Sequence, residues 1–304
     1  MDPFLPQIKL PQWFGGQMGV PGSDTPLGLR TLPQGIVYYV DGSHPNALDA
    51  NDGTDPNAPK ATIQSAITDN NATIDWAATP PYEGVNVIVV SPGTYAENLT
   101  PPYYCLVVGA GIATGNMTDF CVNVEPATGS ALAGTGLAAH FKNIRFTANT
   151  AVPVVDFDVC NSVIFENCMI TDGNPGLATV GIDMTDAGGS WFIGCKFTGN
   201  TNPLTIGLRS TGDFFSCRVV GCQIQAVTTG IHLSDGAGLT GNALIAHNYI
   251  YKPVNGIITA TGGPLVVGNW ITASVDAISH TDADMTIDNH VSVGGAGAIE
   301  LAGT

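Results

Sequence analysis

The chain has 304 residues, of which 9 are Lys or Arg and 25 are Asp or Glu, so its formal net charge is −16 at pH 7. This excess of negative charge argues against a nucleic-acid partner, because binding to phosphates depends on Lys and Arg. The 38 Gly and 20 Pro, with only 11% charged residues, indicate many turns and little helix. No apolar run is long enough to cross a membrane, so we expect no membrane partner.

Residues 1–36 form an N-terminal arm that combines many Pro and Gly with large apolar side chains. The arm lacks the apolar stretch of a secretory signal peptide, and an acidic residue stands at position two. A disordered linker would not normally carry so much apolar surface. Two interpretations stay open: the arm folds back on its own chain, or it anchors the chain to another protein. The anchor interpretation predicts six partner-binding residues, namely Phe4, Leu5, Ile8, Leu10, Trp13 and Phe14.

The chain after the arm begins with a predicted strand at residues 37–40. Residues 60–78 are the one convincing helix, for which Thr62 is the expected N-cap. The apolar stripe of this helix consists of Ile63, Ala66, Ile67 and Ile74. Residues 85–90 follow as a predicted buried strand.

From residue 141 onward the chain repeats a six-residue pattern, seen most clearly in IAHNYI at 245–250 and VVGNWI at 266–271. Its first position is apolar except for Thr286, its sixth position is apolar, and its fourth position is Ile, Cys or Asn. The fourth positions, 20 to 27 residues apart, are Ile144, Cys168, Cys195, Cys222, Asn248, Asn269 and Asn289. A repeat of this length without an amphipathic helical stretch predicts a solenoid of short strands.

A second repeated unit is a small residue, or Pro, followed by an aliphatic one. A small residue permits a sharp turn, and the next aliphatic side chain then points inward. Equivalent positions of successive coils should stack about 4.8 Å apart, and Asn in a repeated bend should tolerate left-handed dihedrals and bond to the Asn one coil away. The pairs are Pro153-Val154, Gly181-Ile182, Gly207-Leu208, Gly230-Ile231, Gly256-Ile257, Ala277-Ile278 and Ala298-Ile299.

The segment before the repeats reads YVDG…NDGTDPNAP-ATIQSAI…VIVVSPGTYAENL…LVVGAG. This order resembles the start of the pectin-lyase-like, right-handed parallel β-helix superfamily, and the similarity covers about residues 37–304. The resemblance implies an all-β, right-handed, single-stranded parallel β-helix with a short N-terminal capping helix, in which Ile63 and Ile67 cover the first coil. It implies little about function, because one fold carries many.

Cysteine usage gives no sign of a disulfide framework or a zinc site. The odd number of cysteines and the absence of paired CxxC spacing argue against both. Three of them share the fourth position of the repeat and should be small core residues. The seven are Cys105, Cys121, Cys160, Cys168, Cys195, Cys217 and Cys222. We therefore predict no metal and no cofactor.

The catalytic motifs of the superfamily are absent. Polygalacturonases, for example, need paired Asp residues around the scissile bond, whereas this chain has no Asp-Asp pair and no Gly-His-Gly. One constellation remains, in the outward row Val155, Asp183, Arg209, His232, Ile258, Ser279 and Glu300. Asp183, Arg209 and His232 should stack on three successive coils, as candidate catalytic residues of a polysaccharide hydrolase or lyase. The favoured alternative is a solvated ion-pair ladder.

Two other groups of side chains could form sites. Trp191, Tyr249, Tyr251 and Trp270 lie near bends, where they would either form a carbohydrate surface or, as favoured, pack against a neighbouring subunit. The segment 280–284, with Asp288 and His290, has the alternation of a metal site. Polar turn residues are the favoured interpretation there.

Three functions are compatible with the sequence. The favoured one is a structural protein of a virus particle, such as a bacteriophage capsid decoration or spike, attached to other virion proteins through the arm and located at the virion surface. The alternative is a tailspike depolymerase that binds or cleaves a host-surface glycan. A second alternative is a secreted, extracellular polysaccharide lyase or adhesin. The residues at 297–304 should leave apolar side chains and a strand edge uncovered, which predicts a homotrimer.

Overall fold

The computed structural model describes residues 35–76, 85–111, 120–173, 179–199, 204–233, 241–251, 253–259, 264–273, 275–280, 286–293 and 300–301. The six predicted partner-binding residues of the arm lie outside this set. Most of the segment 297–304 does too, so the anchor and the trimer stay predictions. No described helix is long and apolar enough to span a membrane.

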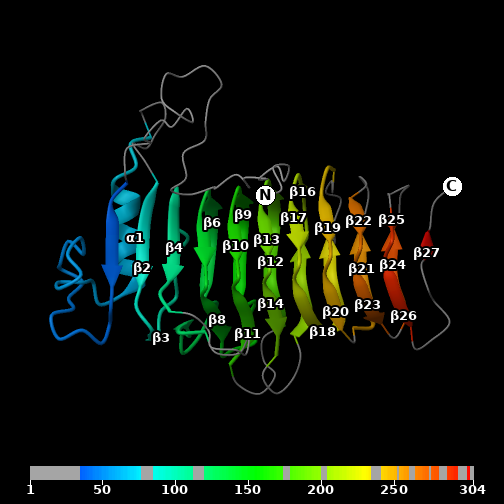
Figure 1. The fold of residues 1–304 in the computed structure, drawn as a ribbon, viewed down its shortest axis with the longest axis horizontal. Coiled ribbons are helices and arrows are strands. Elements are labelled where there is room, and N and C mark those ends of the chain that lie inside the picture. Colours follow the sequence, from blue (N-terminus) through cyan, green and yellow to red (C-terminus); the bar gives the residue numbers. More distant parts are fainter. Residues whose placement is uncertain are drawn as a thin grey trace, which may run out of the picture.

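The described residues form a parallel β-helix whose coils follow one another in chain order along the long axis (Figure 1). Its first face is a 10-stranded parallel sheet in which each coil adds one strand. The strands of this face are β1 (Val37–Val40), β2 (Asn86–Val90), β4 (Cys105–Gly109), β7 (His140–Lys142), β10 (Ile164–Glu166), β13 (Trp191–Ile193), β17 (Arg218–Val220), β19 (Leu244–Ala246), β22 (Leu265–Val267) and β25 (Thr286–Ile287).

The second and third faces are joined into one 17-stranded sheet, because β18 (Gln223–Leu233) pairs with strands of both. The second face contains β3 (Gly93–Tyr95), β5 (Val122–Val124), β8 (Arg145–Ala148), β11 (Met169–Asp172), β14 (Lys196–Thr198), β20 (Tyr249–Tyr251), β23 (Trp270–Ala273) and β26 (His290–Val293). The third face contains β6 (Leu132–Leu137), β9 (Val155–Asn161), β12 (Val180–Gly188), β15 (Leu204–Ser210), β16 (Phe214–Phe215), β21 (Asn255–Thr259), β24 (Asp276–His280) and β27 (Glu300–Leu301).

The six-residue repeat forms the bend from the first face to the second. Its first position lies on the first face, its fourth follows the bend, and its sixth lies on the second face, all pointing inward. Contrary to our expectation, left-handed dihedrals occur at the third position and not at the Asn of the fourth. The third-position residues, all with φ between 48° and 65°, are Asn143, Asn167, Gly194, Gly221, His247, Gly268 and Asp288. Asn, Asp and Gly favour this conformation because they have short polar side chains or none.

The fourth position is a buried column that is continuous along the axis, as predicted. Asn248 donates from Nδ2 to the Oδ1 of Asn269, and Asn269 donates from Nδ2 to the Oδ1 of Asn289, at 2.9 Å in each case. Each also donates to a first-position carbonyl of the preceding coil, and the Sγ of Cys222 makes the same contact with the carbonyl of Phe192 at 3.4 Å. Cys and Asn therefore have one role here, because both cap a carbonyl exposed by the bend.

All seven cysteines are free thiols. Cys168, Cys195 and Cys222 lie in the fourth-position column, as predicted. Burial away from water disfavours the thiolate and raises the pKa of Cys160 and Cys217 to about 12. These buried thiols are thus poor nucleophiles and belong to the core.

Our prediction for the second repeated unit contains one error of register. Ile182, Leu208, Ile231, Ile257 and Ile278 stack in register, as expected. In the preceding coil, however, Val155 and not Val154 pairs with Ile182, so the outward residue there is Asp156 and not Val155. The spacing misled us because Val154 and Val155 are both aliphatic and both buried.

The helix α1 (Ile63–Ala72) packs against β1 and β2 at the N-terminal end of the stack (Figure 1). Thr62 is its N-cap, and Ile63, Ala66 and Ile67 are fully buried, as predicted. The predicted span 60–78 is too long. The helix ends at the C-cap Thr73, whose hydroxyl donates to the carbonyl of Asn70 and so satisfies one of the last carbonyls of the helix.

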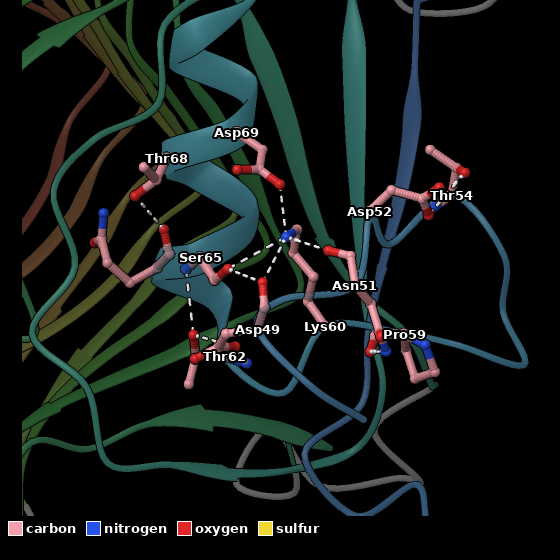
Figure 2. Close-up of polar contacts among 11 residues, drawn as sticks. Asp49, Asn51, Asp52, Thr54, Pro59, Lys60, Thr62, Ser65, Thr68 and Asp69 are labelled. Carbon is pink, nitrogen blue, oxygen red and sulfur yellow. Dashed lines mark hydrogen bonds and ion pairs between the residues drawn. The ribbon is translucent and has the colours of Figure 1, made fainter. Parts of the chain in front are cut away.

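A buried lysine fixes the loop that precedes this helix (Figure 2). Lys60 is 1% exposed, and its ammonium donates to the carbonyls of Asp49 and Asn51 and pairs with the carboxylate of Asp69. A buried charge is tolerated only when it is paired and hydrogen-bonded, and Lys60 meets both conditions. The loop and the capping helix are thus one unit that closes the first coil.

Candidate functional site

The predicted row of charged residues exists on the third face. Asp183 pairs in register with Arg209, and Arg209 with His232, so the three residues lie on successive coils as expected. Arg209 holds Asp183 in a bidentate ion pair, with Nε 2.8 Å from Oδ1 and Nη2 bonded to Oδ2. The ion-pair ladder that we favoured therefore describes Asp183 and Arg209 well, because both charges are already matched.

The corrected register adds a residue that sequence reasoning missed. Asp156 precedes Asp183 in the row, so two carboxylates lie on adjacent coils beside Arg209. Burial raises the pKa of Asp156 first, and the negative charge of Asp183 raises it further. Asp156 is thus protonated more readily than an ordinary aspartate. The sequence did contain a signal for Asp156. Two aliphatic residues follow Pro153, so either Val154 or Val155 could be the inward residue, and Val155 as the inward residue makes Asp156 the outward one.

This row provides two carboxyl groups and a guanidinium, but it does not gather ligands for a metal. Within the described ranges, no group of three or more His, Cys, Asp or Glu side chains could hold a metal ion. The arrangement can position a polar ligand, while its one strong cation is neutralised by Asp183.

A second constellation lies on the second face, where aromatic side chains occupy successive coils. Tyr249 pairs in register with Trp270, and Trp270 with His290. The centroids of the Tyr249 and Trp270 rings are 6.5 Å apart, and those of the Trp270 and His290 rings are 4.2 Å apart. Tyr251, two residues along the same strand, stacks on Tyr249 at 6.0 Å and 15°. We call Tyr249, Tyr251, Trp270 and His290 the aromatic row.

The aromatic row remains open to solvent within the described structure. Trp270 is 50% exposed and Tyr249 is 39% exposed, although both lie on regular strands. Tyr249, Trp270 and His290 hold the fifth position of the repeat, which points outward because the fourth and sixth point into the core. The signal was thus available in the sequence, which placed Tyr249, Tyr251 and Trp270 near bends but did not align them with His290.

The structure rearranges the predicted aromatic group and describes only part of the candidate metal segment. Trp191 does not join the other aromatic residues, because it lies on the first face with the guanidinium of Arg218 4.7 Å from its ring centroid. The candidate metal segment is described only in part. Residues 281–285 lie outside the described residues, and His290 packs on Trp270.

A hollow of about 410 Å³ beside the capping helix is a third candidate, lined by Ser43, Thr62, Tyr95 and Glu97 among others. The carboxylate of Glu97 accepts hydrogen bonds from the backbone N–H groups of Ile63 and Gln64, which are the first residues of α1. Burial raises the pKa of Glu97. This carboxylate already serves as an anion at a helix N-terminus, so the hollow has a structural explanation.

A family model described as "Right handed beta helix region" matches residues 121–271. No curated protein matches the chain. Among solved structures, a pectin methylesterase from Aspergillus niger in penultimately deglycosylated form is similar over 90% of this chain and 91% of its own, with 16% identity and a TM-score of 0.45. Its deglycosylated form is similar over 88% and 89%, with 17% identity and a TM-score of 0.44.

The matched residues include the coils that carry both Asp183 with Arg209 and Tyr249 with Trp270. Together with the parallel pairing of every coil, this match agrees with the all-β fold expected from the sequence. The chain is a right-handed parallel β-helix protein.

Proposed function

We propose that this β-helix binds a glycan on its second face, through the aromatic row Tyr249, Tyr251, Trp270 and His290. The observation that carries the proposal is the alignment of three ring-bearing side chains on three successive coils, with Trp270 and Tyr249 substantially exposed. An aromatic face attracts the weakly positive C–H groups of a sugar ring, and it buries apolar area without any change in charge.

The surroundings of the row suit a polar ligand. Gln223 lies one coil before Tyr249, and Gln225 and Thr272 lie on either side of Tyr251 along the axis. Amide and hydroxyl groups supply the hydrogen bonds that sugar hydroxyls lose when they leave water. The row and its neighbours thus combine an apolar platform with hydrogen-bonding groups, which is the usual composition of a small-molecule site.

The same face is less suited to the subunit contact that we favoured from the sequence. Stable subunit interfaces have an apolar centre and a polar rim, whereas here polar Gln223 continues the row itself. The third face offers the weaker glycan site, because its Arg209 is already paired with Asp183. Glycan binding therefore takes precedence over glycan cleavage in this proposal.

Trp270→Ala should weaken glycan binding at least about tenfold, since a well-packed aromatic anchor contributes more than 1.4 kcal/mol. Binding would be measured by affinity electrophoresis of the full chain through gels that contain single polysaccharides. The matched control is Phe215→Ala, because Phe215 is also exposed, at 48%, but lies on the third face. Equal retardation of the wild type, Trp270→Ala and Phe215→Ala in every gel would overturn the proposal.

A second candidate function is that of a surface component of a virus particle, held there by the arm. The observation in its favour is the cluster of large apolar side chains in residues 1–36, which has the composition of a docking segment. Under this proposal the partners are other virion proteins, the chain is a homotrimer, and the glycan of the second face belongs to the host surface. The extracellular alternative, a secreted polysaccharide lyase or adhesin, would not be attached to a particle.

Deletion of residues 1–36 should abolish attachment while the melting temperature of the β-helix stays within about 2 °C, since no packing of the coils depends on an anchor. Differential scanning fluorimetry and co-sedimentation with assembled particles would measure the two properties. A large fall in the melting temperature would instead mean that the arm covers its own β-helix, and normal co-sedimentation would exclude the anchor.

A further inference from the structure

We propose that the first face of the β-helix is the surface through which one copy of the chain binds a second copy. This inference is independent of the proposed glycan binding, which concerns the second face. The observations that carry it are the chemistry, the charge and the extent of the first face.

The sheet of the first face has aliphatic side chains on both of its sides. The middle residues of β17, β19 and β22 are Val219, Ile245 and Val266, and all three are fully buried in the core. The residues that flank them therefore point outward. Of the eight outward residues on β13, β17, β19 and β22, two are Trp191 and Arg218 and the other six are aliphatic. These six pair in register from coil to coil, and we call them the aliphatic patch, namely Ile193, Val220, Leu244, Ala246, Leu265 and Val267.

A sheet that is apolar on both sides is normally covered on both sides, whereas a side that faces water carries mostly polar residues. The other two faces follow this rule at nearby coils, where Gln223 points outward on the second face and Arg209 on the third. The one helix that the structure describes, α1, packs against β1 and β2 at the end of the stack and not on the patch. All patch residues except Ala246 remain partly exposed in the single chain. The patch thus has the composition of a covered surface.

The charge of the first face suits contact between two chains of the same charge. Each copy has a net charge of −16, so two copies repel each other unless their carboxylates stay apart. The described strands of the first face contain one of the 25 acidic residues, Glu166, and the ammonium of Lys142 neutralises it at 2.7 Å. The guanidinium of Arg218 lies 4.7 Å from the ring centroid of Trp191. A second copy therefore meets a nearly neutral surface.

The extent of the first face fits another copy of the chain better than a small ligand. Its 10 strands, stacked about 4.8 Å apart, form a straight surface about 43 Å long, and three residues per strand make it about 10 Å wide (Figure 1). This area of about 430 Å² is roughly half of the 800 Å² or so that each partner buries in a standard interface, which leaves room for a polar rim. A second copy offers the same length and the same low charge, so the contact can be symmetric and closed.

Sedimentation velocity of the full chain at micromolar concentration tests the proposal. We expect the wild type to sediment as a dimer or trimer. Leu244→Glu should raise the dissociation constant at least about tenfold, because it places a carboxylate in the apolar centre of the contact. The double variant Val220→Thr/Val267→Thr keeps the shape of the patch and should also weaken association about tenfold, since it buries two hydroxyl groups without partners. This milder variant decides the matter if circular dichroism shows that Leu244→Glu does not fold.

The matched control is Thr205→Glu, which adds the same charge at an exposed position of the third face and should leave the dissociation constant unchanged. An equal loss of association in this control would assign the effect to net charge and refute the proposal. A wild type that stays monomeric would refute it too, and would leave the cover of the first face to another protein or another segment of the chain. Unchanged association of the folded patch variants would place the contact between copies elsewhere and likewise refute it. None of these results bears on the aromatic row, whose glycan binding is tested separately with Trp270→Ala.

Discussion

Phe165→Ala should lower the free energy of unfolding by about 3–5 kcal/mol, the usual cost of deleting a buried aromatic ring. Phe165 is fully buried, and its ring stacks between those of Phe141 and Phe192, with centroids 5.2 and 5.7 Å away. The three rings come from the first position of three successive coils. Removing the central ring leaves a cavity that neighbouring coils cannot fill, because each side chain in the column is fixed by its own backbone.

The measurement is urea denaturation followed by circular dichroism. Phe215→Ala is the matched control, since Phe215 is 48% exposed and should cost less than about 1 kcal/mol. Equal midpoints for the two variants would contradict the internal aromatic stack.

Asn269→Leu should cost at least about 3 kcal/mol, because it leaves several buried polar groups without partners. The Oδ1 of Asn269 accepts from the backbone N–H of Asn248 and from its Nδ2, at 3.0 and 2.9 Å. The Nδ2 of Asn269 donates to the carbonyl of Ile245 at 2.9 Å. Leu can make none of these bonds, although its side chain branches at the same atom as that of Asn.

The thermal midpoint of Asn269→Leu would be compared with that of Asn161→Ala, in which an exposed Asn is replaced. The control should change stability by no more than about 0.5 kcal/mol. A midpoint for Asn269→Leu that equals that of the wild type would mean that the axial hydrogen bonds do not hold the coils.

Most of the fold could be predicted because the repeat determines which side chains face the core. The fourth and sixth positions, and the aliphatic column from Ile182 to Ile278, pointed to the correct faces. The prediction failed where two candidates were physically equivalent, as for Val154 and Val155. The predicted helix also extended too far toward the C-terminus, because Ile74 continues the apolar periodicity. The helix itself ends at Thr73, whose hydroxyl donates to the carbonyl of Asn70.

The candidate site was harder to predict because it depends on contacts between coils. Stacking of Asp183 on Arg209 followed from the spacing alone. The sequence analysis grouped Trp191 with Trp270 near bends, whereas in the structure Trp270 and His290 share one outward row and Trp191 lies on another face. Ion pairing likewise could not be predicted from the sequence. Lys142, Lys196 and Arg209 are all cations in predicted strands, but among the described residues Lys196 is the one of these three that makes no ion pair.

The central claim is that a glycan lies on the second face, and hydroxyl-radical footprinting with mass spectrometry tests it most directly. The full chain would be oxidised with and without hyaluronan or alginate, and the oxidation of each aromatic side chain compared. We predict protection of Trp270 and Tyr249, which are exposed in the free chain, and unchanged oxidation of the equally exposed Phe215. Protection confined to the third face around Asp183 and Arg209, with Trp270 and Tyr249 oxidised as in the free chain, would contradict the account.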